Sequence, residues 1–448
     1  MTQSIYLVVG LGKTGHSIAN YLQRRNLPFI FYDTRKEVNN LPEFTQQFPG
    51  VEIFLSDLPP SIYPQIKEII ASPGVALDIP VFTEARNRGI PIIGDIECFA
   101  REVNAPVIAI TGTNGKSTVT TLVGEITKAA GLNVAVAGNI GLPVLDLLDD
   151  KQQYDLWVLE LSSFQLDLTY SLAPLAATIL NISPDHLDRH FSLEAYRQAK
   201  QRIYLKAQFL IYNRDDEQTY PASDIKNINT NLVNFGLDKA TTGNWGIIYK
   251  DNTYFLANGN LPFLAVDLLR LEGKHNWQNA LAACALSFAA GINMEVMSSV
   301  LKTFSGLSHR CQKVRTLNGV DWVNDSKGTN IGATISAILG IGGAIQGKIV
   351  LIAGGLGKGA DFSELKIPVM KFVRAVVLIG KDAAKIEQAL EGVVPSFHAK
   401  SLEQAISIAS KQAQSGDVVL LSPACASQDM FRDFNHRGEV FTSLVEEL

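Results

Sequence analysis

The sequence has few cysteines, no long apolar run and no large excess of charge of either sign. Its four cysteines, Cys98, Cys284, Cys311 and Cys425, lie far apart and form no CxxC pair. A zinc site or a disulfide framework is therefore not expected, whereas free thiols in a reducing compartment are. No apolar run approaches the roughly 18 residues that cross a bilayer, and Met1 to Ser4 lack signal-peptide features and lead into a strand. The expected location is the cytoplasm.

The charge of the chain argues against nucleic acid as a partner, and its length indicates how many domains it contains. A net charge of −5 and a pI near 5.9 argue against a general electrostatic attraction to nucleic acid. The 448 residues are enough for about three domains. A hydrophobic content of 46% with 19% charged residues is typical of soluble globular proteins. We expect a monomer that binds neither nucleic acid nor membrane.

Apolar runs typical of strands alternate with helical patterns along the chain. Residues 1–94 predict strands at 5–9, 29–32, 53–55, 68–71 and 92–93, and a helix at 14–25. Residues 95–305 predict strands at 107–110, 134–137, 156–161 and 177–182, a small antiparallel patch within 209–271 and a helix at 276–290. Residues 306–448 follow a candidate hinge at 305–308 and predict strands at 322–323, 349–353, 375–379 and 418–421.

This alternation predicts an α/β protein of three domains, 1–94, 95–305 and 306–448. The first and third are expected to be Rossmann-like, and the second to contain a mostly parallel sheet. In such sheets, ligands bind at the carboxyl ends of the strands. Candidate binding residues are therefore sought where each apolar run ends.

The most informative stretch of the sequence is Thr111-Gly112-Thr113-Asn114-Gly115-Lys116-Ser117-Thr118. It joins an apolar β-branched run to a helical pattern, so its backbone N–H groups can bind phosphate oxygens. Lys116 is expected to reach the β- and γ-phosphates of a nucleotide, and the Ser117 hydroxyl to bind Mg²⁺. Ile110 stands where the usual loop has glycine, which argues against a generic NTPase. The middle segment is thus predicted to be a P-loop-type ATPase domain.

A second glycine-rich loop, Gly10 to Gly15, matches G-x-G-x-x-G between a strand and a helix. Asp33 ends the next predicted strand, which is typical of a dinucleotide site with the acid on a ribose hydroxyl. Another pyrophosphate ligand, such as a UDP-sugar, satisfies the same geometry. Ser72-Pro73-Gly74 ends a later strand and can add backbone donors at the same edge.

Further along, an acid, a histidine and a lysine are candidates for chemistry. Glu160 ends an apolar strand, where a carboxylate can hold Mg²⁺ beside the phosphates. His186 lies in a polar cluster and is either a metal ligand, a phosphate contact or a solvated loop residue. Lys200 is typical of an exposed helix lysine when only its neighbours are considered. Asn276 is a helix cap or a ligand contact, and Arg310 suits a phosphate or a carboxylate.

Taken together, the motifs resemble the Mur ligase family, ATP-dependent enzymes that join amino acids to a peptidoglycan precursor. The resemblance covers nearly the whole chain and is strongest to the D-glutamate-adding branch of the family. It is carried by T-G-T-N-G-K-S-T, G-x-G-x-T-G with D-T-R and S-P-G, E-L-S-S-F-Q-L, N-I-x-x-D-H-L-D-R-H, Y-R-x-A-K, G-x-H-N-x-x-N, H-R and S-P-A-C-A-S-x-D-x-F.

The resemblance implies an ATP-dependent amide ligase that forms an acyl-phosphate and releases ADP and phosphate. Its substrates are expected to be UDP-N-acetylmuramoyl-L-alanine and D-glutamate, and its cofactors ATP and two Mg²⁺ ions. The implied catalytic residues are Lys116, Glu160, His186 and Lys200, with Ser117, Glu160, His186 and carbamylated Lys200 on the metals.

The resemblance also implies three binding sites. ATP is assigned to Gly112, Thr113, Asn114, Gly115, Lys116, Ser117, Thr118, Asn276, Arg310 and Asp325. The UDP-substrate is assigned to Gly12, Lys13, Thr14, Asp33, Thr34, Arg35, Ser72, Pro73, Gly74 and Asn139. D-glutamate, a small dianion whose amine must stay free, is assigned to His309, Lys327, Thr329, Lys358, Ser427, Gln428 and Phe434.

Three alternatives remain. A sister ligase that adds another amino acid, as in the folylpolyglutamate type, shares the central loop. A NAD-dependent dehydrogenase fits the N-terminal glycines taken alone. A non-catalytic nucleotide-binding regulator would tolerate the loss of Glu160 and His186.

Overall fold

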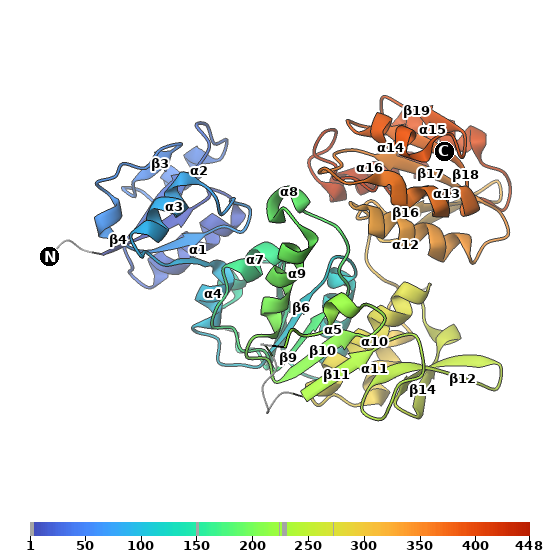
Figure 1. Ribbon diagram of the computed structural model, residues 1–448, viewed down its shortest axis with the longest axis horizontal. Helices are drawn as coiled ribbons and strands as arrows, with labels where there is room; N and C mark the ends of the chain where they lie inside the picture. The colour runs from blue at the N-terminus through green and yellow to red at the C-terminus, as the bar shows by residue number, and fades with distance from the viewer. Residues whose placement is uncertain (1–3, 149–151, 224, 226–230, 272) are drawn as a thin grey trace.

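The computed structural model describes residues 4–148, 152–223, 225, 231–271 and 273–448. Residues 1–3, which the sequence predicts to lead into the first strand, lie outside this range. The described chain forms three sheets with helices packed on them, arranged as three successive bodies in Figure 1. The predicted α/β fold class, with three mostly parallel sheets, is confirmed.

The N-terminal sheet has five parallel strands in the order β3-β2-β1-β4-β5. Its central strand has the apolar sequence IYLVV, as expected for a strand covered on both faces. The strands are β1 (Ile5–Val9), β2 (Phe29–Asp33), β3 (Ile53–Leu55), β4 (Ile66–Ala71) and β5 (Ile92–Gly94). The helices are α1 (Lys13–Arg24), α2 (Leu41–Gln47) and α3 (Pro80–Asn87), with a 3₁₀ turn η1 (Tyr63–Gln65).

The central sheet has nine strands in the order β14-β13-β12-β11-β10-β9-β6-β8-β7. They are β6 (Val107–Thr111), β7 (Val134–Gly138), β8 (Leu156–Glu160), β9 (Ala176–Ile179), β10 (Phe209–Asn213), β11 (Asn231–Phe235), β12 (Trp245–Lys250), β13 (Thr253–Asn258) and β14 (Leu261–Ala265). The α-helices are α4 (Asp95–Ala100), α5 (Lys116–Ala129), α6 (Val144–Leu148), α7 (Ser163–Asp167), α8 (Leu187–His190), α9 (Leu193–Gln201), α10 (Lys274–Ala289) and α11 (Met294–Leu301). Short 3₁₀ turns are η2 (Arg202–Tyr204), η3 (Glu217–Thr219) and η4 (Val266–Leu268).

The antiparallel patch expected within 209–271 is smaller than predicted. Strands β12, β13 and β14 are antiparallel neighbours, whereas β10 and β11 pair in parallel and extend the main sheet. The apolar run of β10 is largely buried, which is typical of an interior parallel strand. The amino-acid pattern of this run does not by itself tell whether the strand pairs in parallel or antiparallel with its neighbours.

The C-terminal sheet has six strands in the order β15-β16-β20-β17-β18-β19, all parallel except β15. They are β15 (Gln312–Leu317), β16 (Val320–Asn324), β17 (Ile349–Gly354), β18 (Val373–Ile379), β19 (Ser396–His398) and β20 (Val418–Leu421). The helices are α12 (Ile331–Gly342), α13 (Lys366–Phe372), α14 (Ala383–Leu390), α15 (Leu402–Gln412) and α16 (Phe434–Glu446), with η5 (Phe362–Leu365) before α13.

The hydrophobic cores differ in how they join the three bodies. One core combines N-terminal residues such as Val8 and Phe31 with central residues such as Trp157 and Tyr204. The two C-terminal cores are built from residues 311–445 alone. The first two sheets are thus joined by apolar packing, whereas the third has its own interior. Within the described residues, no helix is both long and apolar enough to cross a bilayer.

Candidate functional site

The phosphate loop lies between β6 and α5, at the carboxyl edge of the central sheet. Gly112 and Gly115 have φ values of +150° and +82°, which favour glycine. A Cβ atom on Gly115 would lie 2.5 Å from Asn279 Oδ1, so a side chain there would clash with α10. Gly115 also caps α5, whose N-terminus supports anion binding.

Asn181 holds the backbone of this loop. Its Oδ1 accepts a hydrogen bond from Asn114 N (2.8 Å), and its Nδ2 donates to Asn114 O (3.1 Å). Asn181 O also accepts from Thr113 N (2.9 Å). Asn181 was given no role from sequence, although it follows an apolar strand, which is the signal that could have identified it.

Two lysine amines, of the half-buried Lys116 and the buried Lys200, converge on the same loop. Lys116 Nζ donates to the carbonyl oxygens of Gly112 (2.9 Å) and Thr113 (2.8 Å). Lys200 Nζ donates to Gly112 O (2.9 Å) and Thr111 Oγ1 (3.3 Å) and lies 4.5 Å from the ring centroid of Tyr196. Burial lowers the pKa of Lys116 and lowers the pKa of Lys200 further.

Lys200 is only 1% exposed, so its interpretation as a surface lysine from its neighbours is wrong. Its side chain lies under the phosphate loop because α9 packs against the central body on this face. A desolvated amine is more often neutral, and a neutral amine can react with CO₂. The resemblance to the Mur ligase family had singled out this lysine.

Glu160, at the end of β8, has one carboxylate oxygen available for a cation. Its Oε1 accepts from Asn139 Nδ2 (2.9 Å), whereas its buried Oε2 has no hydrogen-bond partner among the described residues. Such an oxygen fits Mg²⁺, which prefers carboxylate, hydroxyl and phosphate oxygens. In the described part of the chain, no three His, Cys, Asp or Glu side chains form a metal site by themselves. Substrate oxygens or a modified lysine would have to complete the coordination. Asn139, assigned from sequence to the UDP-substrate, lies against Glu160.

His186 lies beside Asp185 on the loop after β9. His186 has a left-handed backbone (φ +54°), and its N–H donates to Asp185 Oδ1 (2.9 Å). Burial lowers the pKa of His186 to about 4, so the imidazole is neutral near pH 7 and available as a ligand. The ring of Phe164 packs edge-on against it with centroids 4.9 Å apart.

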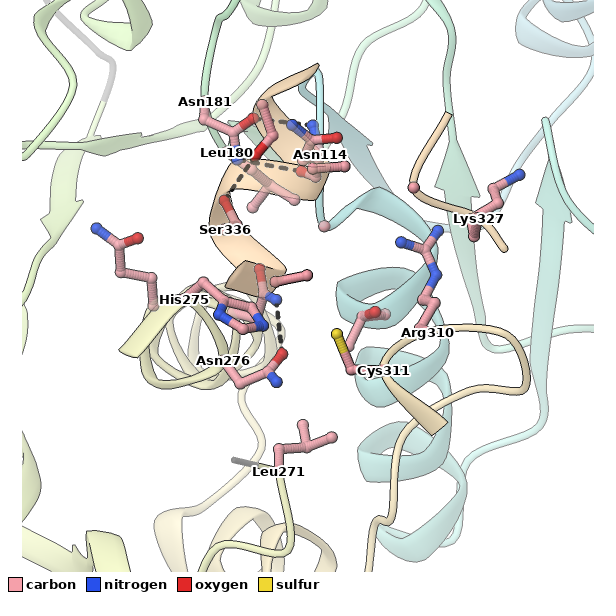
Figure 2. Close-up of a pocket in the computed structure, with 18 of the residues that line it drawn as sticks. Asn114, Leu180, Asn181, Leu271, His275, Asn276, Arg310, Cys311, Lys327 and Ser336 are labelled. Carbon is pink, nitrogen blue, oxygen red and sulfur yellow. Dashed lines mark hydrogen bonds between the residues drawn. The ribbon is translucent and has the colours of Figure 1, made fainter. Parts of the chain in front are cut away.

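A cavity of about 470 Å³ opens beside the phosphate loop, between the central and C-terminal bodies. Figure 2 shows His275 and Asn276 of α10 on one side, and Arg310 and Cys311 on the other. Arg310 Nη2 donates to Ser117 Oγ (2.8 Å), which brings the third body to the phosphate loop. The size and position of the cavity fit the base and ribose of a nucleotide.

Several polar residues of this cavity were missed from sequence. They are Asp215, Asp216 and Gln278. Asp215 Oδ2 accepts from Gln278 Nε2 (2.8 Å), and Asp216 Oδ2 accepts from Ile182 N (2.8 Å). For Asp215 and Asp216, the position shortly after the apolar run of β10 was the available signal, whereas Gln278 lies in the first turns of α10. Asp325, which was predicted, also lines the cavity, and burial raises its pKa to about 6.

The third body contributes lysines to the site. Lys358 Nζ lies 3.5 Å from Asp185 Oδ1. Lys327 Nζ lies 3.6 Å from the centroid of the Phe434 ring, and burial lowers the pKa of Lys327 to about 8. Lys327 N donates to His309 O (3.1 Å), so two of the predicted acceptor residues touch. Thr329 N donates to Lys327 O (2.8 Å) on the same loop.

Ser427 and Gln428 lie on another loop, after β20. Ser427 is buried, and its carbonyl accepts from Phe431 N (2.8 Å), whereas Gln428 is exposed. The loops after β16 and β20 are neighbours because these strands pair directly.

The residues assigned to the UDP-substrate, other than Asn139 of the central body, gather at the carboxyl edge of the N-terminal sheet. Asp33 Oδ2 accepts from Leu11 N (2.8 Å), and Arg35 donates to both carboxylate oxygens of Asp33 (Nε 2.8 Å, Nη2 2.7 Å). Gly12 caps α1, and Lys13 and Thr14 begin it; Thr34 lies between Asp33 and Arg35. Ser72, Pro73 and Gly74 follow β4, and Arg189 of the central body donates to Gly74 O (3.0 Å).

The charges around the phosphate loop are mostly positive. Lys116 interacts electrostatically with Glu160, Asp185, Arg310 and Lys358. Lys327 interacts with the same cluster. An excess of half-buried cations over carboxylates favours anionic ligands, as the triphosphate of a nucleotide and a carboxylate substrate require.

Comparison with known proteins matches all three bodies to one family. The family model described as Mur ligase MurD-like, N-terminal domain, matches residues 4–94. The Mur ligase middle domain matches residues 110–287, and the Mur ligase glutamate ligase domain matches residues 309–425.

Curated relatives match the chain over essentially its full length. A UDP-N-acetylmuramoylalanine–D-glutamate ligase of Legionella pneumophila (strain Paris) is 63% identical, with 100% of both chains covered. The enzyme of the same name from Pseudomonas aeruginosa is 48% identical, with 99% of this chain and 98% of the relative covered.

Solved structures share the fold at low sequence identity. The MurF of Acinetobacter baumannii aligns with a TM-score of 0.63 at 18% identity and covers 99% of this chain and 91% of that one. A UDP-N-acetylmuramate–alanine ligase of Thermotoga maritima aligns with a TM-score of 0.60 at 19% identity, with 99% of each chain covered.

Proposed function

The chain belongs to the Mur ligase family, and on that premise we propose that it joins D-glutamate to UDP-N-acetylmuramoyl-L-alanine using ATP. This is an amide-forming step of peptidoglycan precursor synthesis, and we assign it to the cytoplasm and to a monomer. The acceptor identity is supported by full-length relatives at 46–63% identity that carry this activity in their names.

The observation that carries the proposal is the convergence of two bodies on one phosphate loop. Arg310 and Lys358 of the third body reach Ser117 and Asp185 of the central body. A nucleotide bound by the loop is therefore next to residues that can receive an amino acid. Such an arrangement suits a reaction in which a phosphorylated intermediate is passed to a second substrate.

The first step is attack of the L-alanyl carboxylate of the precursor on the γ-phosphorus of ATP. A P–O bond forms, the bond to ADP breaks, and an acyl-phosphate results. Lys116 and Arg310 neutralise charge on the transferring group. Ser117, Glu160, His186 and carbamylated Lys200 would hold two Mg²⁺ ions, which would supply further charge neutralisation.

In the second step the D-glutamate amine attacks the acyl carbon, an amide bond forms and phosphate leaves. We assign the amino acid to His309, Lys327, Thr329, Lys358, Ser427, Gln428 and Phe434, in which the lysines attract its carboxylates and Phe434 forms an apolar wall. The amine must lose a proton, and burial of the site keeps water from the acyl-phosphate.

The N-terminal body is assigned to the UDP part of the precursor, through Gly12, Lys13, Thr14, Asp33, Thr34, Arg35, Ser72, Pro73 and Gly74, and Asn139 of the central body is assigned to the same substrate. A NAD-dependent reaction is disfavoured because hydride transfer has no need of the ATP-type phosphate loop at residues 111–118. A pyrophosphate ligand other than a dinucleotide fits the same N-terminal glycine loop.

The test is phosphate release from ATP and Mg²⁺ with the UDP-precursor and D-glutamate, L-glutamate or no amino acid. The proposal expects release only with the precursor and D-glutamate together. Release with a different amino acid would indicate a sister ligase and overturn the acceptor assignment. Lys116→Met should abolish release, whereas Lys128→Met, at an exposed position of the same helix, should not.

A further inference from the structure

Asn330 connects the third body to two parts of the central site at once. It caps α12, where its Oδ1 accepts from Ala333 N (2.9 Å). Its Nδ2 donates both to Asn114 Oδ1 of the phosphate loop and to Asp185 Oδ2, each at 3.2 Å. The residue is 9% exposed. Because the cap fixes the oxygen side of the amide, the nitrogen side must face the central body.

Both hydrogen-bond acceptors of Asn330 belong to loops of the proposed reaction site. Asn181 hydrogen-bonds to the backbone of Asn114, which fixes the position from which the Asn114 side chain extends. Asp185 precedes His186 and also faces Lys358. One amide group therefore connects α12 to the nucleotide loop and to the loop that carries the predicted metal ligand.

The neighbouring backbone is shaped for this close approach. A Cβ atom on Gly332 would lie 3.0 Å from Ser183 Oγ and 3.4 Å from Asn114 Nδ2. The first turn of α12 is thus packed directly on the central body. Polar contacts such as these, and that of Arg310 with Ser117, join two bodies whose cores are separate.

We propose that Asn330 is a positioning residue that sets the register of the acceptor body on the phosphate loop. The inference rests on the proposed ligase function, since it concerns transfer between the two bodies. Asn330 does not line the nucleotide cavity, so its effect is on alignment of the amine with the acyl-phosphate. Its hydrogen bonds hold the loop directly before α12, which carries Lys327 and Thr329, against the central body.

The test compares two substitutions of Asn330 with a matched control. Asn330→Asp keeps a cap acceptor but turns the donating nitrogen into an oxygen that faces Asp185. Asn330→Ser keeps a cap and removes the donor without adding charge. Asn293→Asp makes the same chemical change at the exposed cap of α11, where the side chain accepts from Val296 N and contacts no other body.

For Asn330→Asp we expect kcat to fall roughly tenfold to a hundredfold, with KM for the UDP-precursor nearly unchanged. Asn330→Ser should lower kcat by a smaller factor, and Asn293→Asp should have the kcat of the wild type. With an ATP analogue, X-ray scattering should give a larger radius of gyration for Asn330→Asp than for the wild type. If Asn330→Asp and Asn293→Asp fold normally and have the same kcat and the same radius of gyration, the proposal is wrong and Asn330 is only a helix cap.

Failure of the two proposals can be told apart. If the wild type releases no phosphate with D-glutamate, the proposed acceptor is wrong. The scattering comparison with ATP analogue needs no turnover and still tests whether Asn330 holds the two bodies together.

Discussion

Burial gives single residues of this site properties that the same residues lack at the surface. Lys200 illustrates this, because its amine is enclosed under the phosphate loop and hydrogen-bonds to Gly112 O and Thr111 Oγ1. A desolvated lysine with a lowered pKa is a nucleophile at lower pH than an exposed lysine. Carbamylation would replace a buried positive charge by a negative one and so complete a cation site with Glu160.

We predict that Lys200→Arg lowers kcat by about a hundredfold or more, because arginine keeps the charge and cannot react with CO₂. The measurement is phosphate release at saturating substrates, with thermal unfolding as a check on folding. Lys128→Arg, at an exposed position, should retain wild-type activity. A fully active Lys200→Arg enzyme would exclude a carbamate at this position.

A second prediction concerns the orphan oxygen of Glu160. Glu160→Gln keeps the size of the side chain and the acceptor for Asn139 but removes the charge. We expect the Mg²⁺ concentration for half-maximal rate to rise about tenfold or more, with kcat falling by about two orders of magnitude. Glu125→Gln, on the exposed face of α5, is the control. An unchanged Mg²⁺ dependence would remove Glu160 from the metal site.

At the scale of elements, apolar runs predicted most of the parallel strands within a few residues, because a strand buried on both faces needs a continuous apolar sequence. Edge strands β15 and β19 were missed, since β15 contains no buried residue and β19 has a single apolar residue, Phe397, and so forms no apolar run. The glycine loops were found because backbone conformation restricts their composition. Asn330 was missed because its role depends on which bodies face each other, which no local pattern encodes. Asp215 hydrogen-bonds to residues of its own body and was missed although it closely follows the apolar run of β10.

Helix α4 is one of the elements that join the first two bodies, since its neighbour Arg101 pairs both with Glu97 of this helix and with Glu68 of β4. Glu97 of α4 is buried and accepts from Tyr170 N (2.7 Å), Ser171 N (2.8 Å) and Ser171 Oγ (2.8 Å), with Arg101 on the same carboxylate. Burial alone would raise the pKa of Glu97, but these hydrogen bonds outweigh it and lower the pKa. The charged form is therefore the one that stabilises the joint.

We predict that Glu97→Gln lowers the free energy of unfolding by about 1.5–3 kcal/mol at pH 7. The pKa of Glu97 in the folded protein lies below its unfolded value of about 4.5. The extra free energy of unfolding of the wild type over Glu97→Gln is therefore fully present above pH 4.5 and is lost as the pH falls through the folded pKa. Denaturant unfolding at several pH values measures this. A difference that stays constant down to pH 3 would contradict the assignment to the carboxylate.

For the whole molecule, the distribution of cores predicts two units of stability. The N-terminal and central bodies share one core, whereas the C-terminal cores contain residues 311–445 alone. Contacts across the second boundary are polar, as between Lys358 and Asp185. A unit with its own core and few apolar contacts to its neighbour can unfold and move separately. This agrees with a hinge at residues 305–308, where Gly306 has φ +91°.

We therefore predict two calorimetric transitions and expect substitutions to separate them. Glu97→Gln should lower the midpoint temperature of only the transition that belongs to the N-terminal and central unit. Asp417→Asn should lower only the C-terminal one, because Asp417 accepts from Arg374 and from the backbone of Lys348 and Gln414 inside that body. UDP-precursor at about a hundred times its Kd should stabilise the first unit by about 2.7 kcal/mol. A single transition lowered by both substitutions would mean that the polar contacts across the boundary, the Asn330 bridge included, are strong enough to make all three bodies one cooperative unit.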